Sequence, residues 1–144
     1  YLLKCNMELS ESIKIRVRFS EVDSIRMVWH GNYVTYLEDA REAFGRKYGL
    51  EYKTILENNS YAPMFELNLK YKQMVSVDDE LIVNITFIPT KGGKICFKYE
   101  VYNAKNNTPV LTASSIQLFT DLNGNLDPMP EWFEEWKNRN HCNA

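Results

Sequence analysis

The 144-residue sequence has few of the residues that build metal sites, disulfide frameworks or membrane spans. It contains three cysteines, Cys5, Cys96 and Cys142, an odd number without a Cys-x-x-Cys pair. This predicts neither a zinc site nor paired disulfides and favours a reducing compartment, the cytoplasm. With two histidines and no His-Glu-x-x-His motif, we expect no catalytic metal. No apolar run approaches the ~20 residues of a membrane-spanning helix.

Neither sign of charge dominates, because 17 basic and 19 acidic residues leave a net charge of −2. Nucleic-acid-binding proteins usually carry a basic excess, so we expect no nucleic-acid partner. The Gly-x-Ser-x-Gly motif of serine hydrolases is absent. Gly92-Gly93-Lys94 lacks the upstream glycine and the following Ser or Thr of a phosphate-binding loop. The length suits one domain with a substantial core.

Alternating hydrophobic residues predict five strands. The first covers residues 13–19, and its buried face would consist of Ile13, Ile15, Val17 and Phe19. Four more are expected at 65–72, 80–90, 95–103 and 110–120. The sequence Lys91-Gly92-Gly93-Lys94 predicts a tight hairpin, because glycine adopts positive φ without steric cost.

Three helices are predicted, the longest between Asn32 as N-cap and Gly49 as stop. Its buried stripe would consist of Tyr33, Leu37, Ala40 and Phe44. Shorter helices are expected at 51–57 and 129–138. One long helix among antiparallel strands indicates an α+β fold with the helix across one curved sheet. A single helix covers only one face of the sheet, which favours dimerisation.

Asp23 and His30 stand on either side of the loop that leads from the first strand into the long helix. A helix N-terminus offers unpaired N–H groups that can stabilise an oxyanion. A carboxylate facing it can act as nucleophile or general base, which suits acyl transfer. On these residues alone, Asp23 as a turn-former and His30 as an ordinary loop residue remain open.

The segment from Arg16 to Arg41 resembles the 4-hydroxybenzoyl-CoA thioesterase-like family of hotdog-fold proteins, and within it the branch of Tol–Pal-associated acyl-CoA thioesterases. The likeness rests on an aromatic residue, an aspartate, an aromatic–histidine pair, Asn-Tyr, and a helix with Glu and Arg. Here these are Phe19, Asp23, Trp29-His30, Asn32-Tyr33, Glu38 and Arg41. A looser likeness covers the domain core, about residues 13–133 of the single domain expected over 1–144.

The resemblance implies a hotdog fold, with a long central helix wrapped by a five-stranded antiparallel sheet. It implies a homodimer or homotetramer with active sites at the dimer interface, and hydrolysis of acyl-CoA to a free acid and CoA. No cofactor is implied, because coenzyme A is part of the substrate. Asp23 would be the catalytic carboxylate, the His30 N–H the oxyanion donor, and the His30 side chain would position thioester or water. The implied substrate-binding residues are Trp29, Asn32, Tyr33 and Arg26.

Two departures from the family pattern affect the expected acyl specificity. Arg26 stands where the family often has glycine, and Trp29 replaces the commoner tyrosine. A sister branch of the fold uses a helix carboxylate, which makes Glu38 a rival to Asp23. Glu38 and Arg41 are three residues apart on a helix, so we expect an ion pair between them instead.

Two other functions remain open on the sequence. A thioesterase acting on acyl carrier protein would need a basic docking patch, for which Arg16, Arg18 and Arg26 are candidates. A hotdog module that binds acyl-CoA without hydrolysing it is the non-enzymatic alternative. The length and type of the acyl chain are not predicted.

Overall fold

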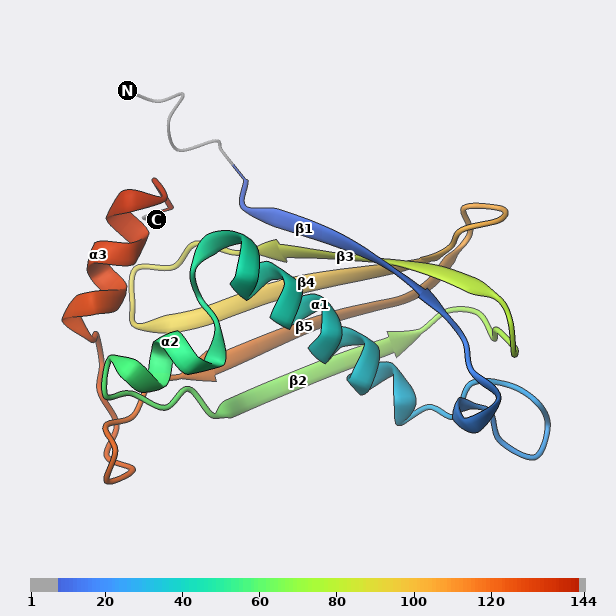
Figure 1. Cartoon of the computed structure of the whole chain (residues 1–144), viewed down its shortest axis with the longest axis horizontal. Coiled ribbons are helices and arrows are strands. Elements are labelled where there is room, and N and C mark those ends of the chain that lie inside the picture. Colours follow the sequence, from blue (N-terminus) through green and yellow to red (C-terminus); the bar gives the residue numbers. More distant parts are fainter. Residues whose placement is uncertain (1–7, 143–144) are drawn as a thin grey trace.

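The computed structural model describes residues 8–142, and in it one antiparallel sheet curves around the helix α1 (Asn32–Tyr48) (Figure 1). The strand order is β1-β3-β4-β5-β2, so β1 and β2 form the two edges. The strands are β1 (Ser10–Arg16), β2 (Met64–Tyr71), β3 (Glu80–Phe87), β4 (Lys94–Asn103) and β5 (Pro109–Leu118). The predicted α+β arrangement of one long helix and five strands is confirmed.

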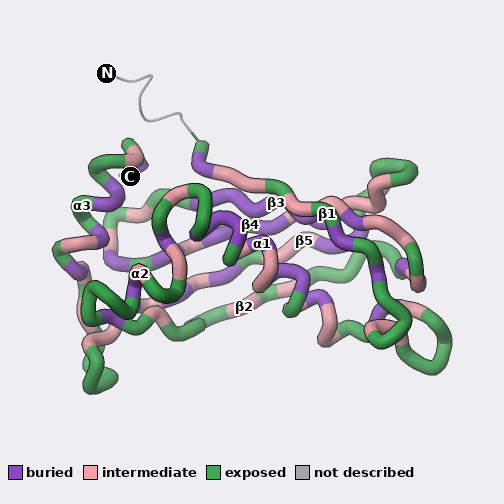
Figure 2. Tube along the Cα trace, in the orientation of Figure 1, coloured by how far each residue is buried: buried purple, intermediate pink, exposed green. Residues whose placement is uncertain are grey.

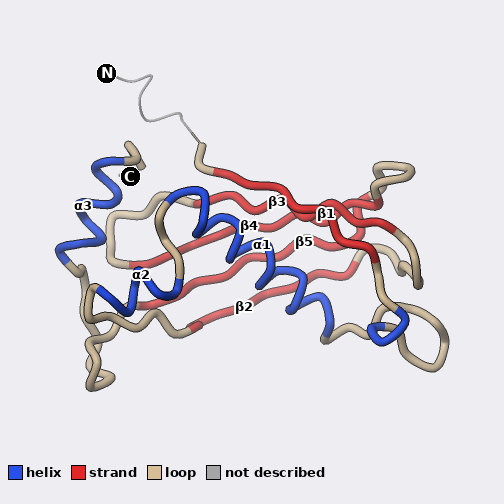
Figure 3. Tube along the Cα trace, viewed as in Figure 1, coloured by secondary structure: helices blue, strands red, loops and turns tan. Residues whose placement is uncertain are grey.

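Helix α1 lies across the concave face of the sheet (Figure 3). It ends before Gly49, as the sequence predicted, and the left-handed φ of 73° at Gly49 turns the chain so that the Leu50 N–H reaches the Gly45 carbonyl at 2.9 Å. At its start the N-cap is Gly31, and Asn32 is already helical. The Asn32 amide is occupied elsewhere, because its Nδ2 donates to the Glu21 carbonyl at 2.8 Å.

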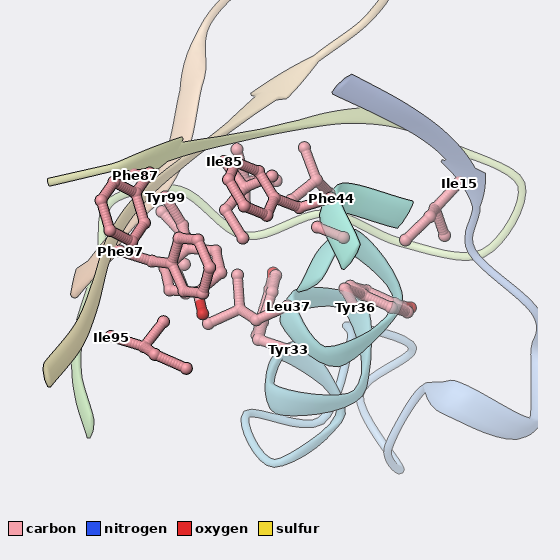
Figure 4. Packing of buried hydrophobic residues seen from close by; sticks show 14 of the residues in the cluster. Ile15, Tyr33, Tyr36, Leu37, Phe44, Ile85, Phe87, Ile95, Phe97 and Tyr99 are labelled. Atoms are coloured by element: carbon pink, nitrogen blue, oxygen red, sulfur yellow. The ribbon is translucent and has the colours of Figure 1, made fainter. Parts of the chain in front are cut away.

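The hydrophobic core lies between α1 and the inner face of the sheet (Figures 2 and 4). The predicted stripe of α1 is buried, and Tyr36 joins it. The ring of Phe44 packs against Phe97, with centroids 4.9 Å apart, and against Phe87 at 6.2 Å. The inner face of the sheet contributes Leu81, Val83, Ile85, Phe87, Ile95, Phe97, Tyr99 and Val101.

Two shorter helices close the end of the sheet beyond the C-terminus of α1. They are α2 (Tyr52–Glu57) and α3 (Glu131–Arg139), close to the predicted ranges. Trp136 Nε1 donates to the Tyr48 carbonyl at 2.8 Å, which fixes α3 against the end of α1. Lys137, almost fully buried, donates to the Thr90 carbonyl at 2.8 Å. No helix within residues 8–142 is long and apolar enough to cross a membrane.

The sequence predicted that Phe19 belongs to the first strand, and this prediction is wrong. Strand β1 ends at Arg16, and Phe19 begins the 3₁₀ turn η2 (Phe19–Glu21) with 82% of its surface exposed. The Glu21 carboxylate accepts a hydrogen bond from the Arg18 N–H at 2.9 Å, and the Glu21 N–H returns one to the Arg18 carbonyl. This local pair of hydrogen bonds turns the chain out of the strand direction.

The prediction that Gly92 and Gly93 are needed for a positive φ in a tight hairpin is also wrong. They do lie in the connection between β3 and β4, but neither has a positive φ. A Cβ on Gly93 would lie 2.8 Å from the Pro128 carbonyl carbon and 2.9 Å from Met129 Cα. Close approach of another backbone segment, not turn geometry, therefore requires this glycine.

Cys96 and Cys142 are free thiols. Burial raises the pKa of both, that of Cys142 to about 11, so neither is an activated nucleophile. Cys5 lies outside the described residues.

Candidate active site

Asp23 opens a tight loop between two paired segments, Val22 and Val28. Its Oδ1 accepts hydrogen bonds from the N–H groups of Ile25 at 3.0 Å and Met27 at 3.4 Å. Asp23 therefore does shape a turn, one of the readings that the sequence left open. Its other carboxylate oxygen, Oδ2, makes no hydrogen bond to any described residue, and the side chain is exposed. One oxygen fixes the loop while the other stays available.

The loop carrying Asp23 is anchored to the rest of the fold at Val28. The Val28 N–H donates to the Val75 carbonyl at 2.9 Å, and Met27 pairs with Ser76 in an isolated bridge. The loop thus lies beside the segment that joins β2 to β3. The segment 19–31 and the first turn of α1 lie together at one end of the molecule (Figure 1).

His30 precedes α1 and is exposed. Within residues 8–142 its N–H has no hydrogen-bond acceptor, and neither has the N–H of Gly31. Two unpaired donors at a helix N-terminus, on the loop that also carries the Asp23 carboxylate, are the components of an oxyanion site. The His30 ring stacks at a tilt on Trp29, with centroids 4.9 Å apart.

Trp29 lies over the N-terminus of α1, with 49% of its surface exposed. A Cβ on Gly31 would lie 2.7 Å from Cε3 of the Trp29 ring. The glycine is therefore what allows the indole to cover this turn. Of the predicted substrate-binding residues, Trp29 is the one whose ring lies directly beside His30.

The other three predicted substrate-binding residues have different surroundings. Arg26 is exposed at a left-handed φ of 66°, and its side chain makes no hydrogen bond or ion pair to any described residue. Asn32 uses its side-chain amide to bind the Glu21 carbonyl. Tyr33 is only 4% exposed, and burial, with a smaller contribution from Tyr71, raises its pKa to about 12.

Tyr71 belongs to this site, although the sequence analysis did not select it. It ends the edge strand β2, and its hydroxyl donates to the His30 carbonyl at 3.1 Å. Its ring meets Tyr33 edge to face, with centroids 5.5 Å apart. The contact joins residues 41 positions apart in the chain, so no local sequence pattern could reveal it.

Glu21 is the second residue that the sequence analysis missed. Its carboxylate accepts a hydrogen bond from the Tyr36 hydroxyl at 2.8 Å, and its carbonyl accepts one from the Trp29 N–H at 2.9 Å. Burial, and then the bond to Glu21, raises the pKa of Tyr36 well above its usual range. Glu21 thereby connects the segment before Asp23 to both the turn at His30 and α1.

A cavity of about 930 Å³ lies beside α1, from Glu38 towards the C-terminal end of the helix. Helix α1 contributes Glu38, Arg41, Glu42 and Arg46 to its wall, and the expected ion pair between Glu38 and Arg41 is present there. The apolar part of the wall includes Leu50, Ile55, Ile95 and Phe97. Along the helix axis, at about 1.5 Å per residue, the wall begins roughly 9 Å from Asn32, at Glu38, and extends to roughly 20 Å, at Arg46. In one chain, no residue of the segment 19–31 lines this cavity.

Residues 17–137 match the family model of the thioesterase-like superfamily. The chain belongs to this superfamily. It is 25% identical to the acyl-CoA thioesterase YbgC of Haemophilus influenzae over 119 residues, 82% of this chain and 85% of YbgC. It is 23% identical to the acyl-acyl carrier protein thioesterase ATL3 of Arabidopsis thaliana over 121 residues, 83% of this chain and 64% of ATL3.

Among solved structures, the thioesterase-like chain superposes on a 4-hydroxybenzoyl CoA thioesterase mutant complexed with 4-hydroxybenzoyl CoA. The TM-score is 0.77 at 20% identity, with 89% of this chain and 98% of that chain covered. The predicted hotdog fold is confirmed, and so are the predicted family and the class of enzyme, a thioester hydrolase. Membership of the Tol–Pal-associated branch stays a prediction.

Proposed function

We propose that the protein is an acyl-CoA thioesterase in which Asp23 supplies or activates the attacking oxygen and the His30 N–H stabilises the oxyanion. One observation carries this proposal: a carboxylate oxygen and a helix N-terminal N–H, both without partners among the described residues, flank a single loop. Acyl-CoA as the substrate is supported by the similarity to YbgC. The reaction needs no cofactor, because CoA belongs to the substrate.

The orientation of the His30 N–H supports its role as oxyanion donor. In a trans peptide the C=O and the following N–H point in opposite directions. The Trp29 carbonyl accepts the Asn32 N–H at 2.8 Å, so it points into the first turn of α1. The His30 N–H then points away from that turn, at the end of the helix where its dipole favours negative charge. A thioester oxygen bound there would gain stabilisation as it becomes an oxyanion.

Asp23 can act in either of two ways. As a nucleophile, its free oxygen attacks the thioester carbon, CoA leaves as the thiolate, and water then hydrolyses the acyl-aspartyl anhydride. As a general base, it takes a proton from water as that water attacks the same carbon. In both, His30 holds the developing negative charge through its N–H, and its imidazole positions thioester or water. Trp29 would wall the acyl site, and Arg26, exposed and unpaired, suits a CoA phosphate.

We also propose that the working unit is a homodimer, or a homotetramer made from two such dimers. Strand β2 is an edge of the sheet, and it leaves Phe65 exposed by 66%. Antiparallel pairing of β2 with its copy would make the two α1 helices antiparallel as well. The N-terminal end of one α1, with Asp23, would then face the cavity at the C-terminal end of the other. A cytoplasmic location remains our expectation from the cysteine content.

A second candidate substrate is an acyl group carried by acyl carrier protein. Exposed apolar and basic residues surround the loop of Asp23, with Phe19 exposed by 82% and Ile25 by 64% next to Arg18 and Arg26. Such a surface suits an acidic carrier protein by charge complementarity. The sequence similarity to the acyl-acyl carrier protein thioesterase ATL3 supports the same candidate substrate.

The test compares the wild type with Asp23→Asn on short, long and aromatic acyl-CoAs and on the same acyl groups carried by acyl carrier protein. Asparagine keeps the Oδ1 acceptor that fixes the loop but loses the charge, so the variant should fold normally. We expect thiol release to fall at least ~100-fold, the scale of general-base catalysis. Asp127→Asn is the matched control, because the Asp127 Oδ1 also accepts the N–H two residues on, from Met129 at 3.2 Å, and the residue lies in the segment before α3.

Each outcome separates the proposals. Activity confined to carrier-protein esters would favour the second candidate. A wild type that binds acyl-CoA but hydrolyses no ester would favour the non-catalytic module. A fully active Asp23→Asn would remove Asp23 from the mechanism, and Glu38 would be replaced next.

A further inference from the structure

We propose that Glu21 is a positioning residue, which sets the spacing between the Asp23 carboxylate and the His30 N–H. It does so through a set of contacts with Tyr36, Trp29 and Asn32, here called the Glu21 clamp. The inference rests on the proposed function, and it assigns Glu21 a role that acts through Asp23 and His30.

The side chain of Glu21 attaches the segment before Asp23 to helix α1. Its Oε1 accepts hydrogen bonds from the Tyr36 hydroxyl at 2.8 Å and from the Arg18 N–H at 2.9 Å. Tyr36 is completely buried, and Figure 4 shows it on the side of α1 opposite Phe97. A hydrogen bond from a buried hydroxyl to a carboxylate is charge-assisted, so it is stronger than one between neutral groups.

The main chain of Glu21 fixes the turn that carries the oxyanion donor. Its carbonyl accepts the Trp29 N–H at 2.9 Å and the Asn32 Nδ2 at 2.8 Å. These two donors lie directly before and after the His30-Gly31 pair. Glu21 therefore binds Tyr36 within α1 through its side chain, and it binds the turn that leads into α1 through its carbonyl.

Apart from these contacts, the loop is held by the hydrogen bonds of Asp23 to residues 25–27 and by the attachment of residues 27–28 to residues 75–76. Asp23 follows Glu21 by two residues, and residues 23–26 are all exposed. Hydrophobic burial therefore cannot fix the position of the carboxylate. Effective attack requires the reacting atoms within about 3–3.5 Å, and a displacement of about 1 Å can cost ~100-fold in rate. The Glu21 clamp is the only link in residues 8–142 that joins the chain before Asp23 directly to both Trp29 and Asn32.

The experiment measures kcat and KM for Tyr36→Phe, Glu21→Ala and Glu21→Gln on the best substrate of the wild type. Tyr36→Phe removes one hydroxyl and should lower kcat about 3- to 10-fold, while Glu21→Ala should lower it roughly 10- to 100-fold. KM should change less than about two-fold in both. Glu21→Gln keeps an acceptor for Tyr36 and should restore much of the lost kcat.

Two matched controls make the same chemical changes outside the site. Tyr102→Phe removes a hydroxyl that donates to Glu100 at 3.4 Å, and Glu80→Ala removes an exposed carboxylate that pairs with Arg16. Both should keep the kcat of the wild type. If Glu21→Ala does not fold, Tyr36→Phe carries the test, because it removes a single oxygen atom.

The results distinguish this inference from the proposed function. Wild-type kcat in folded Tyr36→Phe and Glu21→Ala, together with an inactive Asp23→Asn, would overturn the positioning role and leave the proposed function standing. A lower thermal stability with unchanged kcat would likewise reduce Glu21 to a structural residue. An inert wild type would refute both.

Discussion

Replacing Gly93 with alanine should destabilise the protein through a single methyl group. Gly93 connects β3 to β4 and packs against the backbone that leads into α3, where its N–H donates to the Pro128 carbonyl at 2.9 Å. The new Cβ would lie 2.8 Å from the Pro128 carbonyl carbon and 2.9 Å from Met129 Cα. Both are backbone atoms, so no side-chain rotation can relieve the overlap, and one of the two segments must move.

The expected cost follows from that overlap. Inserting a methyl group into packed surroundings usually costs about 1–3 kcal/mol. For a chain of this length, 1 kcal/mol corresponds to roughly 4 °C in Tm. We therefore expect Gly93→Ala to lower the free energy of unfolding by about 1–3 kcal/mol and Tm by about 4–12 °C.

Gly92→Ala is the matched control, because it makes the same change one residue earlier. Its Cβ would meet only Lys94 Cε, at 3.8 Å. Alanine also restricts the unfolded chain, which favours folding by about 0.4–1 kcal/mol at a compatible site. Gly92→Ala should therefore be neutral or slightly stabilising in urea denaturation. Equal stability of the two variants would refute the argument from close backbone approach.

Two further predictions concern Arg26 and Cys142. Arg26 has a φ of 66°, which costs a non-glycine residue about 1–2 kcal/mol, while glycine loses about 0.5–1 kcal/mol more chain entropy. Arg26→Gly should thus raise the free energy of unfolding by about 0.5–1 kcal/mol, whereas Arg26→Ala should not raise it. Urea denaturation in which both variants match the wild type would contradict this expectation. Burial raises the pKa of Cys142 from 9.0 to about 11, so the folded protein keeps this thiol proton to higher pH than the unfolded chain. The contribution of this thiol to stability is complete below pH 9 and is lost as pH rises towards 11. The free energy of unfolding of Cys142→Ala should therefore fall less than that of the wild type between pH 9 and 11. An equal fall in the two proteins would contradict the raised pKa of Cys142.

The repeating elements of the fold could be predicted from the sequence because each has a local period. The α1 stripe of Tyr33, Leu37, Ala40 and Phe44 follows the helical repeat, and all four residues are buried. Strands β3 and β4 alternate for the same reason. Phe19 matched that alternation but lies in a turn, because hydrogen bonds between Arg18 and Glu21 outweighed the burial of one ring.

The candidate site was only partly predictable. Asp23 and His30 are close in sequence, so their spacing could be compared with that of a family. Tyr71 reaches His30 from a strand 41 residues away, and Glu21 holds the turn at His30 through its backbone carbonyl, which every residue type possesses. Neither contact leaves a signal in a single sequence. Gly93 shows the same limit, since its role depends on a segment 35 residues further along the chain.

The distance between Asp23 and the cavity along α1 has a consequence for how such an enzyme can change over evolutionary time. Within one chain, the walls of the cavity include α2, α1 from Glu38 onward, residues 60–63, the start of β4 and the end of β5, whereas in residues 8–142 the loop of Asp23 neither lines the cavity nor hydrogen-bonds to these walls. Substitutions such as those at Ile55 or Ile95 can reshape the cavity without moving the groups proposed to break the thioester. Asp23 and His30 can thus be kept while the acyl group that the cavity accommodates changes. A library of variants confined to the cavity residues would then test new substrates while leaving the proposed hydrolytic groups in place.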